Sequence, residues 1–147
     1  MTSQLLQRVI VPVANEDDAR TTCEAVKHHL DEEARIHLVH VIEKGGGAPD
    51  KAPLGARQKQ ATETFELAEA VLEPAGYEFQ TEVRYGTDVV DEIVAAVDEH
   101  RATAIAFLPR EGGRITKYLT GNKTRSLVAT DRVPVIALPN ESTYSNN

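Results

Sequence analysis

The sequence predicts one α/β domain built on a doubly wound (Rossmann-like), five-stranded parallel sheet with helices on both faces. Five short apolar segments rich in β-branched residues alternate with stretches that repeat apolar residues at helical spacing. This alternation favours parallel strands joined by right-handed crossovers. The chain has 147 residues, and neither a repeat nor a shift in composition marks a second domain. We therefore expect a single domain over residues 1–147, with a polar tail from about residue 140.

The strands are expected where β-branched and aromatic residues gather. QRVIVPV and ATAIAFLP are almost wholly apolar, as in strands that are buried on both faces. YEFQTEVRYG alternates apolar and polar residues, which predicts a more exposed strand near a sheet edge. In chain order, the expected strands span residues 7–13, 35–43, 77–86, 102–109 and 133–139.

Four helical segments are expected between these strands. The second should stop at Pro74 and Gly76, because both residue types end helices. Thr87 is the expected N-cap of the third helix, which carries Val90 and Ile93 on one face. The other three segments are expected at residues 17–30, 56–73 and about 123–130.

Composition excludes several classes of protein. The chain has 16 basic and 23 acidic residues, a formal net charge of −7, which argues against a broad electrostatic surface for nucleic acid or anionic membranes. Its single cysteine, Cys23, excludes an intrachain disulfide and a zinc site built on several thiolates. The apolar run near the N-terminus is too short for a signal or membrane segment, so we expect a cytoplasmic protein with no membrane insertion.

The remaining reactive side chains form no catalytic pattern. Cys23 lies on the apolar face of the first helix and is expected to be a core residue. His37 and His40 are an odd number of positions apart on one strand, so they should point to opposite faces. The five histidines have no metal-ligand spacing and are expected at the surface or as satisfied core residues: His28, His29, His37, His40 and His100. Nucleophile, base and oxyanion donors are not assembled, so we expect no enzyme, no catalytic residue and no metal site.

Ligands of such sheets bind beyond the carboxyl ends of the strands, which directs attention to the loops there. The loop ANEDDAR after the first strand has no glycine, which excludes a dinucleotide fingerprint. Asp17 and Asp18 in this loop are interpreted as first-turn carboxylates of a helix rather than a phosphorelay pocket. Gly121-Asn-Lys-Thr resembles only the end of a Walker A loop.

The stretch FLPREGGRITKYLTGNKTRSL, residues 107–127, is the strongest candidate for a binding loop. Asn122 would cap the last helix, whose first amides bind anions without any catalytic residue. Basic side chains and a hydroxyl could strengthen such a site, namely Arg110, Arg114, Lys123 and Thr124. In the alternative interpretation, Gly112 and Gly113 only turn the chain and Asn122 only caps the helix. The residues themselves leave both interpretations open.

From about Leu6 to Pro139, the chain resembles a universal stress protein domain. The resemblance rests on the order and spacing of VIVPVAN, IHLVHVIE, YGTDVVDEIV and AIAFLPREGGR…YLTGNKTRSLV…VPVIALP. It implies the same doubly wound fold. It also implies that the chain belongs to one of two groups within the family. Members of one group bind ATP or AMP through a Gly-x2-Gly-x9-Gly-Ser/Thr loop and an aspartate after the first strand. Members of the other group lack the loop glycines and are not expected to bind nucleotide.

This chain keeps only half of that loop. Gly121 matches the last glycine, but Leu108 and Glu111 occupy the two earlier glycine positions, and Gly112 is one place out of register. A carboxylate at position 111 would repel phosphate, and a Cβ blocks close approach of the backbone.

Some of the other positions of the nucleotide-binding motif keep a suitable residue, and others do not. Asn122 stands where the loop has serine or threonine, and Thr124 keeps the later hydroxyl. Ala14 stands where the aspartate is expected, and Val41 occupies the position whose backbone meets adenine. The candidate nucleotide or anion site therefore comprises Pro12, Val13, Ala14, Val41, Pro109, Arg110, Gly112, Gly113, Arg114, Gly121, Asn122, Lys123 and Thr124.

The resemblance further implies a homodimer that pairs the fifth strand with its counterpart, which would cover an apolar sheet edge. The expected interface residues are Val133, Val135, Ile136, Ala137 and Leu138. We expect a non-enzymatic, homodimeric stress-response module with weak or absent ATP binding and an unidentified protein partner. The alternative is an ATP or AMP sensor with a remodelled loop around Arg110–Arg114 and Gly121–Thr124.

Overall fold

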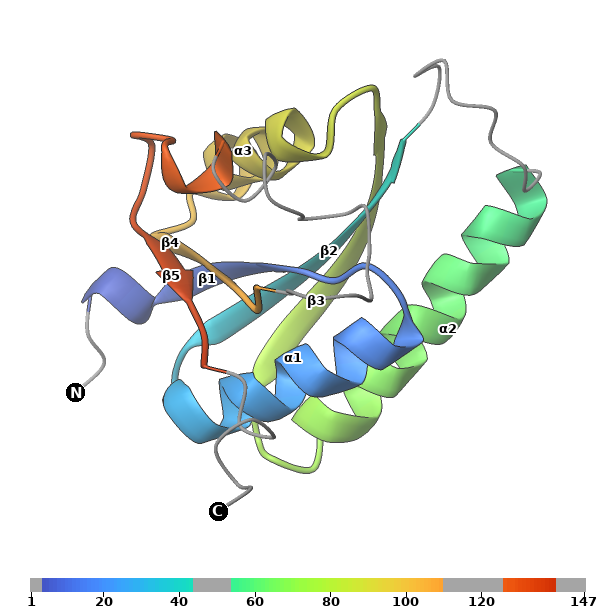
Figure 1. Ribbon diagram of the computed structural model, residues 1–147. Helices are drawn as coiled ribbons and strands as arrows, with labels where there is room; N and C mark the ends of the chain where they lie inside the picture. Colours follow the sequence, from blue (N-terminus) through green and yellow to red (C-terminus); the bar gives the residue numbers. More distant parts are fainter. Residues whose placement is uncertain (1–3, 44–53, 110–125, 140–147) are drawn as a thin grey trace.

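The computed structural model describes residues 4–43, 54–109 and 126–139. Its centre is a five-stranded sheet in the order β3-β2-β1-β4-β5, and every pair of neighbouring strands is parallel (Figure 1). The strands are β1 (Arg8–Pro12), β2 (Arg35–Glu43), β3 (Glu78–Gly86), β4 (Ala104–Phe107) and β5 (Val135–Ala137). The predicted fold class is confirmed, and each strand begins and ends within two residues of its expected bounds.

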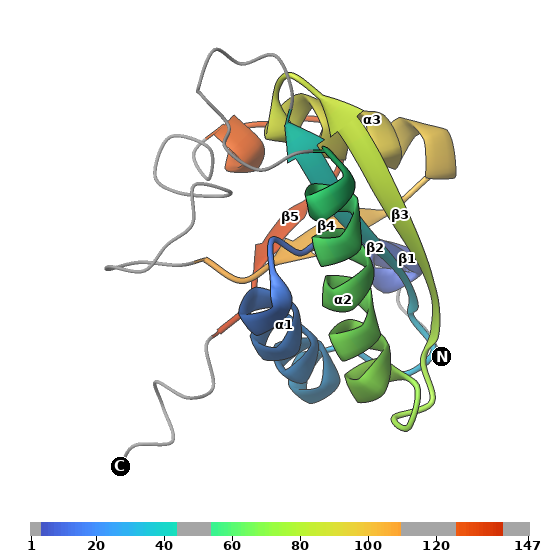
Figure 2. The same cartoon turned by 90° about the vertical axis from the view of Figure 1, so that its right-hand side faces the viewer.

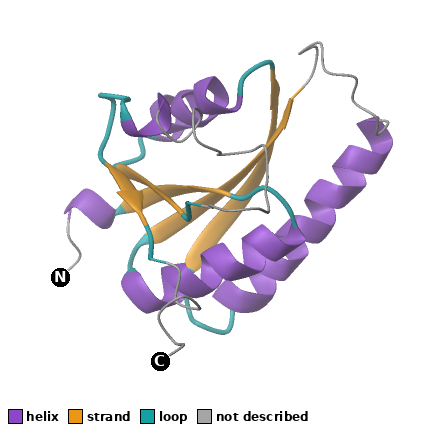
Figure 3. Ribbon diagram, in the orientation of Figure 1, coloured by secondary structure: helices purple, strands orange, loops and turns teal. Residues whose placement is uncertain are grey.

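Helices cover both faces of the sheet. The short 3-10 helix η1 (Gln4–Leu6) leads into β1, and the main helices are α1 (Glu16–His29), α2 (Leu54–Leu72) and α3 (Val89–His100). The helices α1 and α2 pack against each other on one face of the sheet, while α3 lies on the other face (Figures 2 and 3). Of the last predicted helix, at about 123–130, residues 126–130 are described; residues 126–128 are helical and lie on the α3 side, whereas residues 129 and 130 are not helical.

The alternation of side chains along the central strands divides the core into two clusters. On β1, Val9 and Val11 face α1 and α2, whereas Ile10 packs with α3. Because successive residues of a strand point to opposite faces, an apolar strand supplies both layers at once. Leu127 is fully buried in the α3 layer and thereby anchors the end of the last helical segment.

The two edges of the sheet differ in character. β3 is the outer strand next to β2, and all its residues are exposed or half-buried, which confirms the prediction of an exposed edge strand. β5 forms the opposite edge. Among the described residues, no helix is both long and apolar enough to cross a membrane.

The ends of the helices follow local side-chain chemistry. Asn15 caps α1 by accepting a hydrogen bond from the amide of Asp18. The prediction of Thr87 as the N-cap of α3 is wrong by one residue, because Asp88 adopts the extended conformation and accepts from the amide of Asp91. After α2, Gly76 has a φ of 90°, a left-handed conformation that glycine adopts without strain, and so ends the helix as predicted.

Candidate functional site

The described residues of the predicted site lie at the carboxyl edge of the sheet, where β1 and β4 are neighbours. The chain leaves β1 toward α1 on one face and reaches β4 from α3 on the other, so this is a topological switch point (Figure 1). Pro12 ends β1, with Val13 and Ala14 directly after it, and Pro109 follows β4. Val41 lies further along β2, which continues with β3 beyond the end of β1. The fold thus brings these five candidates to one edge.

A buried carboxylate closes the loop after β1. Asp18 Oδ2 accepts a hydrogen bond of 2.7 Å from the amide of Ala14, and Asp18 Oδ1 accepts one of 3.2 Å from the hydroxyl of Thr22. Asp18 as a whole residue is 6% exposed, whereas the side chain of Asp17 is 81% exposed. The interpretation as a first-turn carboxylate therefore describes Asp17 well, but Asp18 has the additional task of ordering the loop.

The end of β1 is also held by His40 on β2. Its Nδ1 lies 2.9 Å from the carbonyl oxygen of Val13, while the amide of Val13 donates to the carbonyl of Val39 at 2.9 Å. His40 is buried on the α1–α2 face, edge-on to the ring of Phe65. Burial lowers the pKa of His40, although the hydrogen bond to Val13 opposes the shift. The expectation of a satisfied core histidine is confirmed here.

Buried side chains occupy the position of the first loop glycine and the position expected to meet adenine. Leu108, in the place of the first glycine, is 4% exposed and belongs to the α1–α2 core. Val41 is 5% exposed and lies opposite Arg84 in the register of β2 and β3. The remaining candidates lie outside the described residues: Arg110, Gly112, Gly113, Arg114, Gly121, Asn122, Lys123 and Thr124.

The predicted interface residues lie on or beside the edge strand β5. Pro134 and Leu138 bond to β4 through their backbones, because Ile105 donates to Pro134 and Leu138 donates to Phe107. The backbone groups of the alternate residues Val135 and Ala137 therefore point away from β4. Side chains in this strand range from half-buried to exposed, whereas that of Leu138 is buried in the core. Val133, just before the strand, is half-buried and packs on the α3 layer.

The structure also brings together residues that sequence spacing did not connect. His37 on β2, Glu82 on β3 and His100 at the end of α3 meet on the α3 face of the sheet. His37 and His40 do point to opposite faces, as predicted. The period of two along β3 places Glu82 on the same face as Arg84, but the register of β2 with β3 is needed to find the cluster.

Glu82 is the centre of this second cluster. Burial raises the pKa of its carboxyl, but hydrogen bonds to His37 and His100 and the charge of Arg84 outweigh burial and hold the pKa below its ordinary value. Arg84 pairs with Glu82 at 2.8 Å, with Glu92 at 3.1 Å and with Glu99 at 2.9 Å. The hydrogen bond to Glu99 is the main reason why the pKa of Arg84 is raised. Glu82 is therefore an ionised carboxylate in a fixed orientation.

Comparison with known proteins identifies the family. The profile described as the universal stress protein family matches residues 6–139, nearly the whole described chain. A search of curated proteins found no match.

Solved structures of this family share the fold. A universal stress protein from Burkholderia pseudomallei is 19% identical, with 93% of this chain and 98% of that chain covered and a TM-score of 0.72. The universal stress protein from Archaeoglobus fulgidus, solved in complex with dAMP, is 20% identical, with coverages of 92% and 99% and a TM-score of 0.64. Another, in complex with cAMP, is 15% identical, with coverages of 91% and 97% and a TM-score of 0.67. With a family profile that spans the sheet and the candidate loops, the chain belongs to the universal stress protein family.

Proposed function

We propose that this protein is a non-enzymatic, homodimeric stress-response module in which ATP binding is weak or absent. The observation that carries the proposal is the hydrogen bond from the amide of Ala14 to the buried carboxylate of Asp18. The chain's own negative charge thereby occupies the loop at the switch point, where a nucleotide would otherwise find amide donors.

The positions of the phosphate motif support the same conclusion. Leu108 stands in the first glycine position and is part of the core, so it cannot be moved aside without opening a cavity. Glu111 stands in the second glycine position and adds a negative charge to the loop. Phosphate oxygens would meet a Cβ and a carboxylate where the motif supplies bare backbone.

A dimer through β5 is supported by the edge of the sheet. Val135 and Ala137 direct their backbone groups outward, and their side chains are small and apolar. An edge with such groups is a template for another strand, and a two-fold axis would pair β5 with its own copy. Regulation would then pass through protein contacts made by the dimer.

Calorimetric titration with ATP, ADP and AMP in the presence of Mg²⁺ tests the nucleotide part. We expect dissociation constants above about 10 μM, or a binding free energy weaker than about −7 kcal/mol. Tighter binding would establish the alternative, an ATP or AMP sensor, for which the complexes of relatives with dAMP and cAMP are precedents. In that case Arg110→Ala and Asn122→Ala should each weaken binding.

A variant designed to gain ATP affinity tests why we expect ATP binding to be weak. Glu111→Gly restores a glycine position and removes a charge, so ATP affinity should increase. Glu73→Gly is a matched control, because it makes the same exchange at an exposed turn after α2. An unchanged affinity in the Glu111 variant would show that this residue is not what limits binding.

The dimer is tested by light scattering coupled to size exclusion at micromolar concentration. We expect the mass of two chains for the natural protein and of one chain for Ala137→Glu, since like charges would face each other across the axis. Ala70→Glu, at an exposed position of α2, should remain dimeric. A monomeric natural protein would remove the dimer from the proposal.

A further inference from the structure

Two imidazoles converge on one carboxylate oxygen on the α3 face of the sheet. His37 Nε2 lies 2.9 Å from Glu82 Oε1, and His100 Nε2 lies 3.0 Å from the same oxygen. The two rings are stacked at an angle, with centroids 4.0 Å apart and planes inclined by 38°. We call these three residues the His37–Glu82–His100 triad.

Three elements hold the triad in place. In the parallel register of β2 and β3, His37 is opposite Gln80, so Glu82 lies diagonally beside it on the same face. The helix α3 delivers His100 as its last residue, because Arg101 adopts a left-handed conformation with a φ of 54°. The donor atoms of the triad therefore come from a rigid sheet and a helix end rather than from a loop.

Arg84 orients the carboxylate from behind. It pairs with Glu82 Oε2, which leaves Oε1 directed at the imidazoles. Its guanidinium is in turn neutralised by Glu92 and Glu99. Three carboxylates, those of Glu82, Glu92 and Glu99, therefore surround the single guanidinium of Arg84. The net negative charge of this group favours the binding of a divalent cation.

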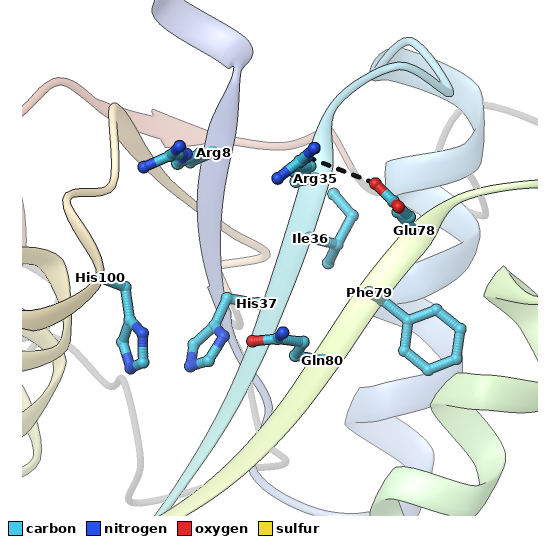
Figure 4. A pocket seen from close by; sticks show the side chains of 8 residues that line it. All are labelled: Arg8, Arg35, Ile36, His37, Glu78, Phe79, Gln80 and His100. Carbon is cyan, nitrogen blue, oxygen red and sulfur yellow. Dashed lines mark ion pairs between the residues drawn. The ribbon is translucent and has the colours of Figure 1, made fainter.

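The triad is accessible from solvent. The side chains of His37, Glu82 and His100 are 12%, 27% and 37% exposed. Both imidazoles line a hollow of about 310 Å³ at the amino ends of the strands (Figure 4). In Figure 4 they project side by side, whereas Arg8, Arg35 and Glu78 lie at the other end of the hollow, the latter two paired. An ion can therefore reach the donor atoms without opening the core.

From this arrangement we propose that the triad binds a divalent transition-metal ion, with Zn²⁺ the best match. The ligands are Nε2 of His37, Nε2 of His100 and Oε1 of Glu82. Two imidazoles and one carboxylate are a ligand set that suits Zn²⁺ and, in the same geometry, Co²⁺ and Ni²⁺. Three protein ligands leave a fourth position open for water or a small anion from the hollow.

The geometry requires only a small adjustment. Metal bonds of about 2.0–2.2 Å in a tetrahedral site separate the ligand atoms by roughly 3.4 Å. The two nitrogen–oxygen distances of 2.9 and 3.0 Å must therefore lengthen by a few tenths of an ångström. His100 is half-exposed at a helix end and can move by that amount. Binding replaces the protons that now lie between nitrogen and oxygen.

Calorimetric titration of the untagged protein with ZnCl₂ tests the proposal, with MgCl₂ as a comparison. We expect one Zn²⁺ per chain with a dissociation constant below about 10 μM, and no binding of Mg²⁺, which avoids imidazole. Co²⁺ should give the intense visible absorption of a four-coordinate site. No zinc binding below about 100 μM by a folded chain would overturn the proposal and leave the triad as a hydrogen-bonded cluster.

Substitutions test whether the three residues of the triad are the ligands of the metal ion. His100→Gln and Glu82→Gln should each weaken Zn²⁺ binding by a factor of ten or more and abolish the cobalt spectrum. His28→Gln is the matched control, because it removes an exposed histidine of α1 outside the triad and should leave affinity unchanged. Circular dichroism establishes that each variant is folded. Undiminished binding in both triad variants would place the metal elsewhere and refute the assignment.

Discussion

The Nδ1 of His40 lies 2.9 Å from the carbonyl oxygen of Val13 and so joins the middle of β2 to the end of β1. A neutral imidazole can donate this hydrogen bond while it stays buried beside Phe65. The contact sits next to the switch point, where the loop closed by Asp18 begins. It makes the stability of this edge of the sheet dependent on the protonation of His40.

The pH dependence of unfolding should report His40. Its pKa in the folded protein is below the ordinary value of 6.5, mainly because of burial. Between these two values the unfolded chain binds more protons, so the free energy of unfolding decreases as the pH falls below 6.5. This contribution is fully present above pH 6.5 and changes by at most about 1.4 kcal/mol per pH unit. Urea unfolding from pH 5 to 8 measures it.

His40→Asn tests the assignment, because asparagine keeps a donor near the Nδ1 position but does not titrate. The variant should lose the His40 part of the slope, and its smaller side chain should cost about 1–2 kcal/mol at pH 7.5. His28→Asn, at an exposed site, should retain the natural slope. An equal slope in the His40 variant and the natural protein would contradict the prediction.

Asp18 and its neighbour Asp17 form a matched pair. Asp18→Asn should reduce the free energy of unfolding by about 1–3 kcal/mol, since the amide cannot accept from both Ala14 and Thr22. Asp17→Asn removes an exposed pair with Arg20 and a first-turn negative charge, and should change this free energy by less than about 1 kcal/mol. Chemical denaturation of both variants compares them, and equal effects would show that the buried carboxylate does not order the loop.

Arg84 should be far more important for stability than Arg35, the exposed arginine at the start of β2. Arg84→Met would remove the cation beside the carboxylates of Glu82 and Glu92, of which only Glu82 keeps hydrogen bonds to His37 and His100, at an expected cost of about 1–3 kcal/mol. Arg35→Met, which breaks an exposed pair with Glu78, should cost less than about 1 kcal/mol. Thermal unfolding at low and high salt measures both. A similar small loss for each would mean that solvent screens the Arg84 network.

Cys23 should be unreactive in the folded protein. The thiol is fully buried, and burial, with smaller effects of Asp18 and Glu24, raises its pKa to about 12. Because the thiolate is the reactive species, a disulfide reagent at pH 8 should modify the native chain at least a hundredfold more slowly than the chain in denaturant. Rapid modification of the native protein would show that α1 opens readily.

Periodicity predicted the elements of this fold well because it reflects burial directly. The alternation in YEFQTEVRYG correctly indicated an edge strand, and the spacing around Cys23 correctly indicated a core position. The N-cap of α3 was misplaced from Asp88 to Thr87, since both residue types cap helices and only the backbone conformation distinguishes them.

The candidate site was predicted in part. The strand order brings Val13, Val41 and Pro109 to one edge, as parallel topology requires. The burial of Asp18 could not be read from sequence, because Asp17 has the same chemistry and the same first-turn position. Consecutive helical residues point about 100° apart, so the rotation of α1 against β1 selects which carboxylate is buried.

By itself the sequence determined the class of fold, the order of its elements and the residues that replace the loop glycines, because these depend on local patterns along the chain. Only the tertiary structure decided that His37, Glu82 and His100 share one oxygen. Their contact spans 63 residues of sequence from His37 to His100 and depends on the register of two strands and the end of one helix. Contacts of this kind are set by tertiary packing, which the local spacing of residues in the sequence does not encode.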